Sequence, residues 1–186
     1  MKVGVAVPCH RKDTPFLPQC LGAIHRLNPP SYTCSVLVNK GEYSMKVLRE
    51  TLLDALFSVG CNIVLSCDAD FLLHPSILNH VDASRVTSFA QFERNWGDWQ
   101  QTLTRLFWRH NWSGLYSIPE PLWPQIKNGW DGSDTSVHKI VGDNYKFVRR
   151  FCYTPMRPTN TFSLLKTLKK RVIPLKKAER EVNRNI

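Results

Sequence analysis

The stretch Ile63-Val-Leu-Ser-Cys-Asp-Ala-Asp70 places two carboxylates directly after a short apolar run. Short apolar runs of this kind are typical of buried strands, where unpaired charge is unfavourable. Carboxylate oxygens at the end of a strand suit Mg²⁺ or Mn²⁺ shared with substrate phosphates. The stretch therefore predicts a strand over residues 62–66 followed by a metal-binding loop. The alternative is an acidic turn that caps the next helix.

Strands and helices alternate before this stretch. Further strands are predicted at residues 3–7 and 34–38, and helices at residues 15–27 and 45–59. Thr14 is the predicted N-cap of the first helix, with Pro15 at its first position, and Ser44 caps the second. This alternation predicts right-handed crossovers and a mostly parallel sheet with helices on both faces. Ligands of such sheets bind at the carboxyl ends of the strands, here residues 8–12, 39–41 and 68–70.

The alternation is lost after residue 84, although a strand at 86–92 and a helix at 135–141 are predicted. All six tryptophans lie between residues 96 and 130: Trp96, Trp99, Trp108, Trp112, Trp123 and Trp130. They indicate either a second core beneath long loops or an aromatic wall for a substrate, sugar or lipid. The sequence is compatible with both interpretations.

Composition and cysteine usage bound the class of protein. With 186 residues, of which 42% are hydrophobic, the chain has the size and composition of one globular domain with a tail. No apolar run reaches the ~20 residues of a membrane span. The six cysteines form no Cys-x-x-Cys pair, so we expect buried thiols rather than zinc ligands. These features predict a cytoplasmic protein.

The net charge of +10 lies entirely in the last 41 residues. Residues 1–145 carry 13 basic and 13 acidic side chains, whereas residues 146–186 carry 12 basic and 2 acidic ones. We therefore predict a domain over residues 1–160 and a basic amphipathic tail over 161–186. The tail is expected either to dock its leucines on the domain or to bind an anionic membrane surface. Nucleic acid is a less favoured partner, because the tail has few aromatic rings to stack on bases.

Several stretches together resemble glycosyltransferases with the GT-A fold, of the family-2 type that uses nucleotide-diphospho-sugars. They are Val5-Ala-Val-Pro-Cys-His10, Leu17-Pro-Gln-Cys-Leu21, Val36-Leu-Val-Asn-Lys-Gly41, Ile63-Val-Leu-Ser-Cys-Asp-Ala-Asp70 with His74-Pro75, Trp112-Ser-Gly-Leu-Tyr-Ser-Ile118 and Gly129-Trp-Asp-Gly-Ser-Asp-Thr-Ser-Val-His138. Their order and spacing carry the resemblance, which covers about residues 1–155. It implies a single Rossmann-like α/β domain and a nucleotide-diphospho-sugar donor.

The resemblance implies a nucleotide site at the first two strand ends. Pro8, His10 and Arg11 would border the nucleobase. The family commonly ends its second strand in an acid that reads the base, and this chain has Asn39 there. An amide can hydrogen-bond a base but carries no charge, so the identity of the nucleotide stays open.

The resemblance also implies the reacting groups. Asp68 would contact the ribose or the metal, and Asp70 would hold Mn²⁺ or Mg²⁺ against the diphosphate. Arg157 would clamp the diphosphate. Inverting members use a carboxylate that opens a helix as general base, and Asp134 is the candidate here, with Asp131 as a substitute. The alternative for the segment is that Ser133 or Asp134 only caps the helix.

The resemblance therefore implies the metal-dependent transfer of a sugar to a hydroxyl acceptor, and inversion at the anomeric carbon is preferred because it needs only one base. A nucleotidyltransferase is one rival function. It usually carries a glycine-rich loop after the first strand, and residues 8–13 contain no glycine. A non-catalytic nucleotide- or nucleic-acid-binding module on the same fold is the other rival.

Overall fold

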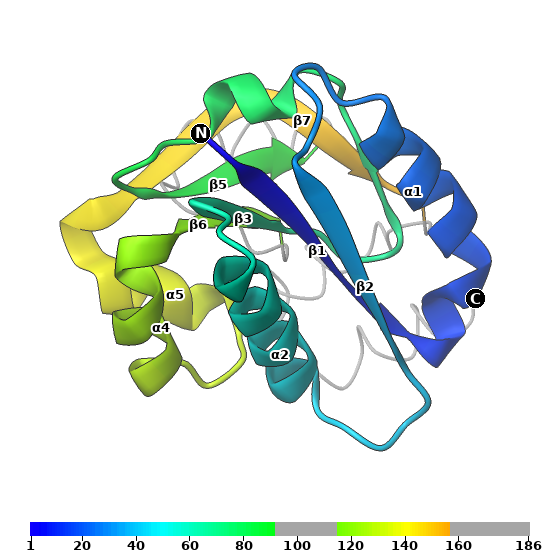
Figure 1. Ribbon diagram of the computed structural model, residues 1–186, viewed down its shortest axis with the longest axis horizontal. Coiled ribbons are helices and arrows are strands. Elements are labelled where there is room, and N and C mark those ends of the chain that lie inside the picture. The colour runs from blue at the N-terminus through cyan, green and yellow to red at the C-terminus, as the bar shows by residue number, and fades with distance from the viewer. Residues whose placement is uncertain (92–114, 157–186) are drawn as a thin grey trace, which may run out of the picture.

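One sheet runs through residues 1–91 and 115–156, which are the residues that the computed structural model describes (Figure 1). Its strands are β1 (Val3–His10), β2 (Thr33–Asn39), β3 (Ile63–Ser66), β4 (Phe71–Leu73), β5 (Val86–Gln91), β6 (Tyr116–Pro119) and β7 (Tyr145–Pro155). Their order is β2-β1-β3-β6-β5-β7-β4. The pairing directions give β1, β2, β3, β5 and β7 one orientation and β4 and β6 the other. The predicted mostly parallel α/β sheet is confirmed.

Helices cover both faces of this sheet, as predicted (Figure 1). The helices are α1 (Leu17–His25), α2 (Met45–Ser58), α4 (Trp123–Gly129) and α5 (Asp134–Val141), with short 3₁₀ turns at Arg11–Phe16, Ile77–His80, Glu120–Leu122 and Gly142–Asn144. Helix α1 packs on one face, and α2, α4 and α5 pack on the other. None of these helices combines the length and the apolar character that a bilayer crossing requires.

The alternation of side chains along β1 produces two separate cores. Val5, Val7 and Cys9 point toward α1 and pack with Cys20. Ala6 points to the opposite face, where it joins the core formed with α2, α4 and α5. Successive strand residues face opposite sides of a sheet. A strand whose side chains are apolar on both faces is therefore buried on both faces of the sheet.

Strand β1 is longer than the sequence predicts, because it continues through Pro8 to His10. A central strand has a neighbour on each side, so each of its residues normally donates an N–H to one of these neighbours, and proline has none to donate. Here the ladder between β1 and β3 ends at the pair Ala6 and Ser66. The missing N–H of Pro8 therefore faces a side on which β3 has already ended, while Pro8 still aligns with Leu37 of β2.

The predicted start of the first helix at Thr14 and Pro15 is wrong. Residues 11–16 form a 3₁₀ turn that contains Pro15, and the Thr14 hydroxyl donates to the carbonyl of Arg11 at 2.7 Å. Helix α1 begins only at Leu17. The predicted cap of α2 is confirmed, since Ser44 Oγ accepts a hydrogen bond from the N–H of Val47 at 3.3 Å.

The end of the sheet opposite β2 contains two strands, β7 and β4, that the sequence did not predict. Strand β4 follows Asp70 directly and pairs antiparallel with the end of β7, in the register Phe71 to Pro155. Strand β7 also pairs in parallel with β5, with register shifts after Phe89 and Ala90. This pairing returns the chain from residue 155 to the loop that carries the two aspartates.

Candidate functional site

The ends of β1, β2 and β3 bring most of the predicted site residues to one edge of the sheet. His10 and Asn39 are register partners at the ends of β1 and β2. Strand β3 ends at Ser66, two residues before Asp68. Pro8 is buried within β1, whereas Arg11 is exposed in the turn that follows it. The carboxyl edge of the sheet therefore holds the predicted nucleotide-binding and metal-binding positions together.

A buried arginine that the sequence did not single out holds the Asp68 carboxylate. Arg49 lies on α2, its side chain is 7% exposed, and its Nη2 is 3.0 Å from Asp68 Oδ1. Its Nη1 donates to the carbonyl of Gly132 at 3.3 Å. One guanidinium thus connects the end of β3 with the loop that leads into α5. The signal in the sequence was a basic residue at the border of the leucine stripe of α2.

The main chain of Asp68 is held as firmly as its side chain. Its carbonyl accepts the N–H of Phe71 at 3.1 Å and lies 3.4 Å from the Cys67 thiol and 3.9 Å from the Cys20 thiol. Burial, and then the neighbouring Cys20, raise the pKa of Cys67 well above its usual range. The Cys67 thiol therefore stays protonated and acts as a donor to this carbonyl.

Asp70 is half-buried beside Asp68. Burial, followed by the charge of Asp68, raises the pKa of Asp70, and the ammonium of Lys12 opposes this rise. The Asp70 carbonyl accepts the N–H of Met156 at 2.7 Å, which ties the loop to the end of β7. The negative charge of Asp68 beside the half-buried Asp70 makes this a place where a cation is favourable.

The residues present fit a divalent cation with hard oxygen ligands. Asp68 and Asp70 supply carboxylate oxygens at a fixed loop. Residues 1–91 and 115–156 contain no group of three or more His, Cys, Asp or Glu side chains placed to hold a metal. Mg²⁺ and Mn²⁺ are commonly bound by one or two carboxylates together with substrate phosphates and water. The pair therefore suits an ion that arrives with a phosphorylated ligand.

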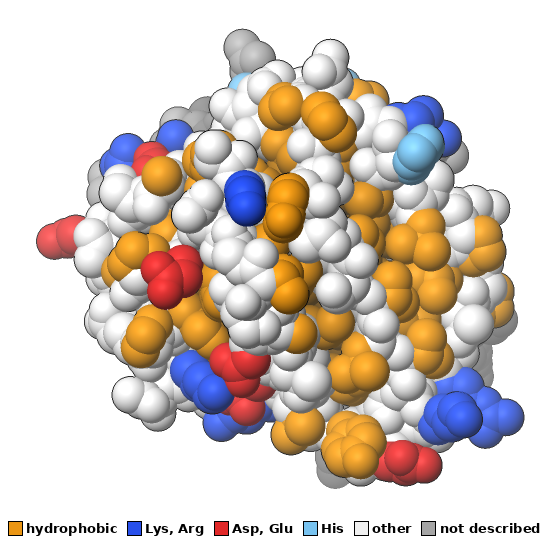
Figure 2. Space-filling view, in the orientation of Figure 1, with side chains coloured by type: hydrophobic (Ala, Val, Ile, Leu, Met, Phe, Trp, Pro, Cys, Tyr) orange, Lys and Arg blue, Asp and Glu red, His pale blue; other side chains and the backbone are white. Residues whose placement is uncertain are grey.

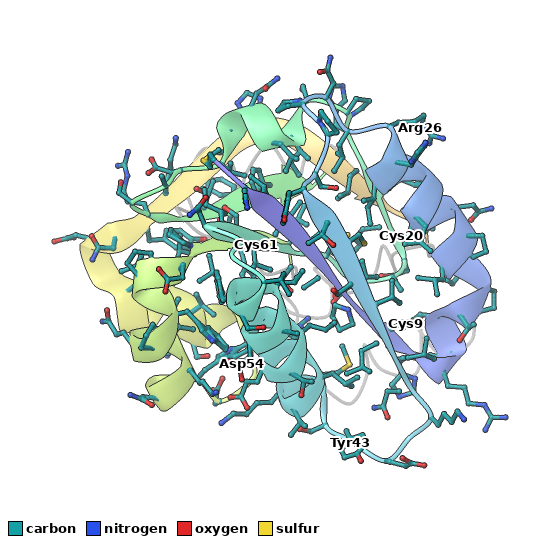
Figure 3. The ribbon with its side chains drawn as sticks, viewed as in Figure 1. Cys9, Cys20, Arg26, Tyr43, Asp54 and Cys61 are labelled. Atoms are coloured by element: carbon teal, nitrogen blue, oxygen red, sulfur yellow. The ribbon has the colours of Figure 1, made fainter. Side chains whose placement is uncertain are left out.

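Asn39 has a structural task in the loop after β2. It is 3% exposed, and its Oδ1 accepts the N–H groups of Gly41, Glu42 and Tyr43 at 2.9, 3.1 and 3.3 Å. Its Nδ2 donates to the carbonyl of Tyr43. Tyr43 lies on this loop with its side chain 60% exposed (Figure 3). The contact between Asn39 and a nucleobase stays a prediction, and the amide already shapes the loop.

The two acids proposed as bases, Asp131 and Asp134, have different positions at the start of α5. Asp131 accepts the N–H of Ser133 at 2.7 Å. Hydrogen bonds from the Ser136 hydroxyl and then from Ser133 lower the pKa of Asp131 to about 2. It is a weak base that secures the beginning of the helix, while the Ser133 side chain makes no capping bond. Helix α5 begins at Asp134, whose side chain is not among those that the structure describes.

Two of the six tryptophans lie within the described residues, and both are core residues. Trp123 and Trp130 are 6% and 2% exposed, and their rings meet edge to face with centroids 6.2 Å apart. Trp123 Nε1 donates to Asp54 of α2 at 2.8 Å, on the side of α2 that faces α4 (Figure 3). The other four tryptophans, Arg157 and the tail lie outside the described residues.

The cysteines behave as buried apolar residues. Within the described residues, the free thiols are Cys9, Cys20, Cys34, Cys61 and Cys67. Cys9 and Cys20 lie between the sheet and α1 (Figure 3). Burial raises the pKa of Cys34 to about 11. Burial also raises the pKa values of Cys9, Cys61 and Cys67, so these three thiols and Cys34 carry a proton at neutral pH.

No family model matches the sequence, and no curated protein matches it. Solved structures do match. The 1–349 fragment of S. aureus TarS in complex with UDP has a TM-score of 0.59 at 13% identity, over 83% of this chain and 60% of the fragment. The mannosyltransferase PcManGT from Pyrobaculum calidifontis, in complex with GDP-Man and Mn²⁺, has a TM-score of 0.60 at 14% identity, over 89% of this chain and 59% of that one. The chain has the GT-A fold.

A third GT-A structure agrees. Glucosyl-3-phosphoglycerate synthase from Mycobacterium tuberculosis, in complex with Mg²⁺ and uridine diphosphate, has a TM-score of 0.53 at 13% identity, over 91% of this chain and 79% of that chain. The resemblance found in the sequence is confirmed at the level of the fold. The chain spans about 60% of the length of the TarS fragment, so activity, donor and acceptor are matters for proposal.

Proposed function

We propose that this protein is a glycosyltransferase that moves a sugar from a nucleotide-diphospho-sugar to a hydroxyl group of an acceptor. The observation that carries the proposal is the pair of Asp68, which Arg49 holds, and Asp70 beside it, at the carboxyl edge of a GT-A sheet. The solved structures of this fold that contain UDP or GDP-Man support the donor class.

The donor would lie across the ends of β1, β2 and β3. The loop with Pro8, His10 and Arg11 borders the base, and the loop shaped by Asn39 lies beside it. Arg157 follows the end of β7, which is tied to Asp70 through Met156, and is proposed to pair with the diphosphate. This arrangement would place the sugar in front of the two aspartates.

Asp70, with Asp68 beside it, would hold a divalent cation, Mn²⁺ or Mg²⁺. When bound, such an ion offsets the negative charge of the diphosphate and of the departing nucleoside diphosphate. The half-buried position of Asp70 makes this charge pairing stronger than it would be in water. Arg49 keeps the neighbouring Asp68 in place and shares its charge through a direct hydrogen bond.

Asp134 is proposed to accept the proton of the acceptor hydroxyl. The acceptor oxygen then forms a bond with the anomeric carbon as the bond between that carbon and the diphosphate oxygen breaks. The nucleoside diphosphate leaves with the bonding electrons, and the configuration at the anomeric carbon is inverted. Asp131 is a poor substitute because hydrogen bonds from Ser136 and Ser133 already hold its carboxylate.

A donor screen tests this function. The protein is incubated with Mn²⁺ and each common nucleotide-sugar, and release of nucleoside diphosphate is measured. We expect release from one donor class, its loss in Asp70→Ala, and unchanged release in the control Asp54→Asn. Asp54 lies on α2, and within residues 1–91 and 115–156 its carboxylate bonds only to Trp123 and Lys127. Pyrophosphate release from a nucleoside triphosphate and a sugar phosphate would instead indicate a nucleotidyltransferase.

A binding module without catalysis would give a third pattern. It would bind nucleic acid in a salt-dependent manner and would neither bind nor cleave a nucleotide-sugar. Filter binding of RNA and DNA at low and high salt, run beside the donor screen, separates this outcome from an enzyme whose donor is missing from the panel.

A further inference from the structure

The imidazole of His10 is fixed at the end of β1 by a hydrogen bond from the turn that follows. His10 is the N-cap of the 3₁₀ turn Arg11–Phe16, and its Nδ1 accepts the N–H of Lys12 at 3.4 Å. A ring nitrogen that accepts a hydrogen bond uses its lone pair, so a neutral His10 carries its proton on Nε2. The ring therefore presents an N–H donor on the edge that faces away from the Lys12 backbone.

Three strand ends direct side chains to the same face of the sheet. Ala6 belongs to the core beneath α2, and strand residues alternate, so the His10 side chain also lies on the α2 face of β1. Asn39 is the register partner of His10 in a parallel pair and shares that face. Asp68 bonds to Arg49 of α2. Because β1 is the strand between β2 and β3, His10 lies between the loop after β2 and the metal-binding loop.

The Nε2 of His10 is available to a ligand. The side chain is half-buried, and within residues 1–91 and 115–156 its Nε2 makes no hydrogen bond. A half-buried donor of this kind is suited to a ligand that brings an acceptor. It is not suited to a metal ion, because a nitrogen that carries a proton has no lone pair to offer.

Asn39, the position at which the resemblance places the reader of the base, has no such group to offer. Its Oδ1 accepts three backbone N–H groups, its Nδ2 donates to the carbonyl of Tyr43, and the residue is only 3% exposed. The amide is therefore occupied by its own loop. Reading of the base falls to the neighbouring strand end, where His10 lies.

The ends of β1 and β2 also carry exposed positive charge. Arg11, Lys12 and Lys40 are exposed, with Glu42 as an exposed acid close to them in the chain. Figure 2 shows Lys and Arg side chains together at the lower right, where Figure 1 places the ends of these two strands. Positive charge at this end of the sheet suits a ligand with phosphates.

We infer that His10 selects the nucleobase of the donor through a hydrogen bond from its Nε2–H to a ring carbonyl. The inference rests on the proposed function, which lays the nucleotide across these strand ends. Uracil has a carbonyl where cytosine has an amino group, and guanine and hypoxanthine have one where adenine has an amino group. The amino group would direct an N–H at the N–H of His10. The site therefore accepts keto bases and disfavours amino bases.

Calorimetry of the full chain in Mn²⁺ with two matched pairs of nucleotides tests this selection. UDP is compared with CDP, and inosine diphosphate with ADP, so that ring size and diphosphate are the same within each pair. For whichever ring size the site accepts, the keto base should bind at least ~10-fold tighter, because the amino base loses one hydrogen bond and leaves two donors facing each other.

Two substitutions separate the cap of the turn from the donor. His10→Asn keeps an oxygen near the place of Nδ1, so it still caps the turn, but it has no group at the place of Nε2. Its affinity for the keto base should fall ~10-fold, to that of the amino base. His10→Gln places an amide near Nε2 that can donate or accept, so the amino base should gain ~10-fold while the keto base changes little.

His74→Asn is the matched control. His74 also caps a turn, since its Nδ1 accepts the N–H of Ser76 at 3.2 Å. It follows β4, which runs opposite to β1 and so leads away from the carboxyl edge. This variant should keep the wild-type preference for the keto base.

The outcomes distinguish the inference from the function on which it rests. An equal loss of affinity for keto and amino bases in His10→Asn would assign His10 to the ribose or the phosphates and would overturn the inference. Nucleotide binding without a preference, or a preference unchanged in His10→Asn, would also overturn it while the proposed function stands. Failure of every nucleoside diphosphate to bind in Mn²⁺ would refute the proposed function, and the inference with it.

Discussion

Arg49 is the side chain on which the geometry of the candidate site depends most. It is buried on α2, bonds to Asp68 at the end of β3, and bonds to the Gly132 carbonyl before α5. Gly132 has a φ of +89°, and a Cβ there would lie 2.7 Å from Cβ of Lys46. The loop therefore approaches α2 closely enough for Arg49 to reach it.

Replacing Arg49 should destabilise the protein and weaken donor binding together. Arg49→Met keeps an unbranched apolar stem but removes the hydrogen bonds to Asp68 and Gly132. Hydrogen bonds to charged groups contribute about 1.5–3 kcal/mol each when buried, so we expect a loss of about 2–3 kcal/mol in the free energy of unfolding. Urea denaturation measures this loss, and the donor KM should rise in the same variant.

Lys46→Met on the same helix provides the control. Lys46 pairs with Glu50 at 3.7 Å, and its side chain is 40% exposed, so its removal should cost less than about 1 kcal/mol. Equal losses in both variants would mean that Arg49 has no special place in the structure.

The two acids at the start of α5 should respond differently to the same change. Asp134→Asn removes the proposed proton acceptor and should lower turnover by ~10²-fold or more, with little change in stability. Asp131→Asn weakens the hydrogen bonds to Ser133 and Ser136 and should lower the melting temperature more than the turnover. Steady-state kinetics and thermal melts of both variants check this. The reverse pattern would make Asp131 the base.

At the level of residues, the sequence predicted where the two acids lie, just after a strand, but not which side chain holds Asp68. Two carboxylates directly after a buried strand are unusual, so the sequence drew attention to Asp68 and Asp70, and their role as metal ligands stays a prediction. Arg49 was not, because it stands 19 residues earlier on a helix and only the packing of α2 against β3 brings it to Asp68. Asn39 was predicted as a ligand of the base, whereas its amide is already engaged by the loop after β2.

At the level of elements, Asp82 joins the beginnings of β5 and β7. Its carboxylate accepts the Ser84 N–H at 3.0 Å and the Ser84 hydroxyl at 2.8 Å, and it pairs with Arg85 at 3.1 Å and Lys146 at 3.5 Å. Burial alone would raise the pKa of Asp82, but the bonds from Ser84 and then Arg85 lower it far below its usual range.

This pKa predicts how stability changes in acid. A lowered folded-state pKa stabilises the protein above the unfolded value of about 3.9, and that stabilisation is lost as pH falls through the folded value. Asp82→Asn keeps an oxygen for Ser84 and should cost about 1–3 kcal/mol at neutral pH. The difference from wild type should shrink below pH ~4. A difference that is constant with pH in urea titrations would show that the charge of Asp82 is unimportant.

Element boundaries were predictable where local signals are strong. Ser44 before the stripe of α2 marked the true helix start, and Val86 began a strand as expected. Thr14 and Pro15 gave a wrong helix start, because a threonine followed by a proline fits a 3₁₀ turn as well as the beginning of an α-helix. Strand β7 has no simple alternation, since it pairs with β5 through register shifts and with β4 by its end. Long-range pairing of this kind leaves little local trace in a sequence.

On the scale of the whole molecule, the basic tail is expected to bind an anionic membrane surface. The tail at residues 161–186 carries a large part of the positive charge, and a helical spacing relates Leu164, Leu165, Leu168 and Val172. We expect full-length protein to sediment with anionic vesicles at low salt and to dissociate at high salt, because each basic residue near such a surface contributes about 1 kcal/mol. A chain ending at Asn160 should not sediment.

Neutral vesicles are the control for the apolar face of the tail. Equal sedimentation with anionic and neutral vesicles, or equal behaviour of both chain lengths, would contradict membrane binding by charge. The result would then favour docking of the tail on the domain.

The overall architecture was the most predictable level, because alternating strands and helices leave few ways to form one sheet. The sequence did not predict that β6 runs against β3, or that β4 closes the far edge. These antiparallel strands follow the aspartate loop and the segment after residue 114, where strand-forming runs are short.

The most direct test of the central claim is calorimetry of nucleoside diphosphates with and without a divalent ion. The account predicts that one nucleoside diphosphate binds in Mn²⁺, that EDTA abolishes this binding, and that Asp70→Ala abolishes it while Asp54→Asn binds as wild type does. Equal affinity in Mn²⁺ and in EDTA, or unchanged affinity in Asp70→Ala, would contradict a metal-bridged diphosphate at Asp68 and Asp70.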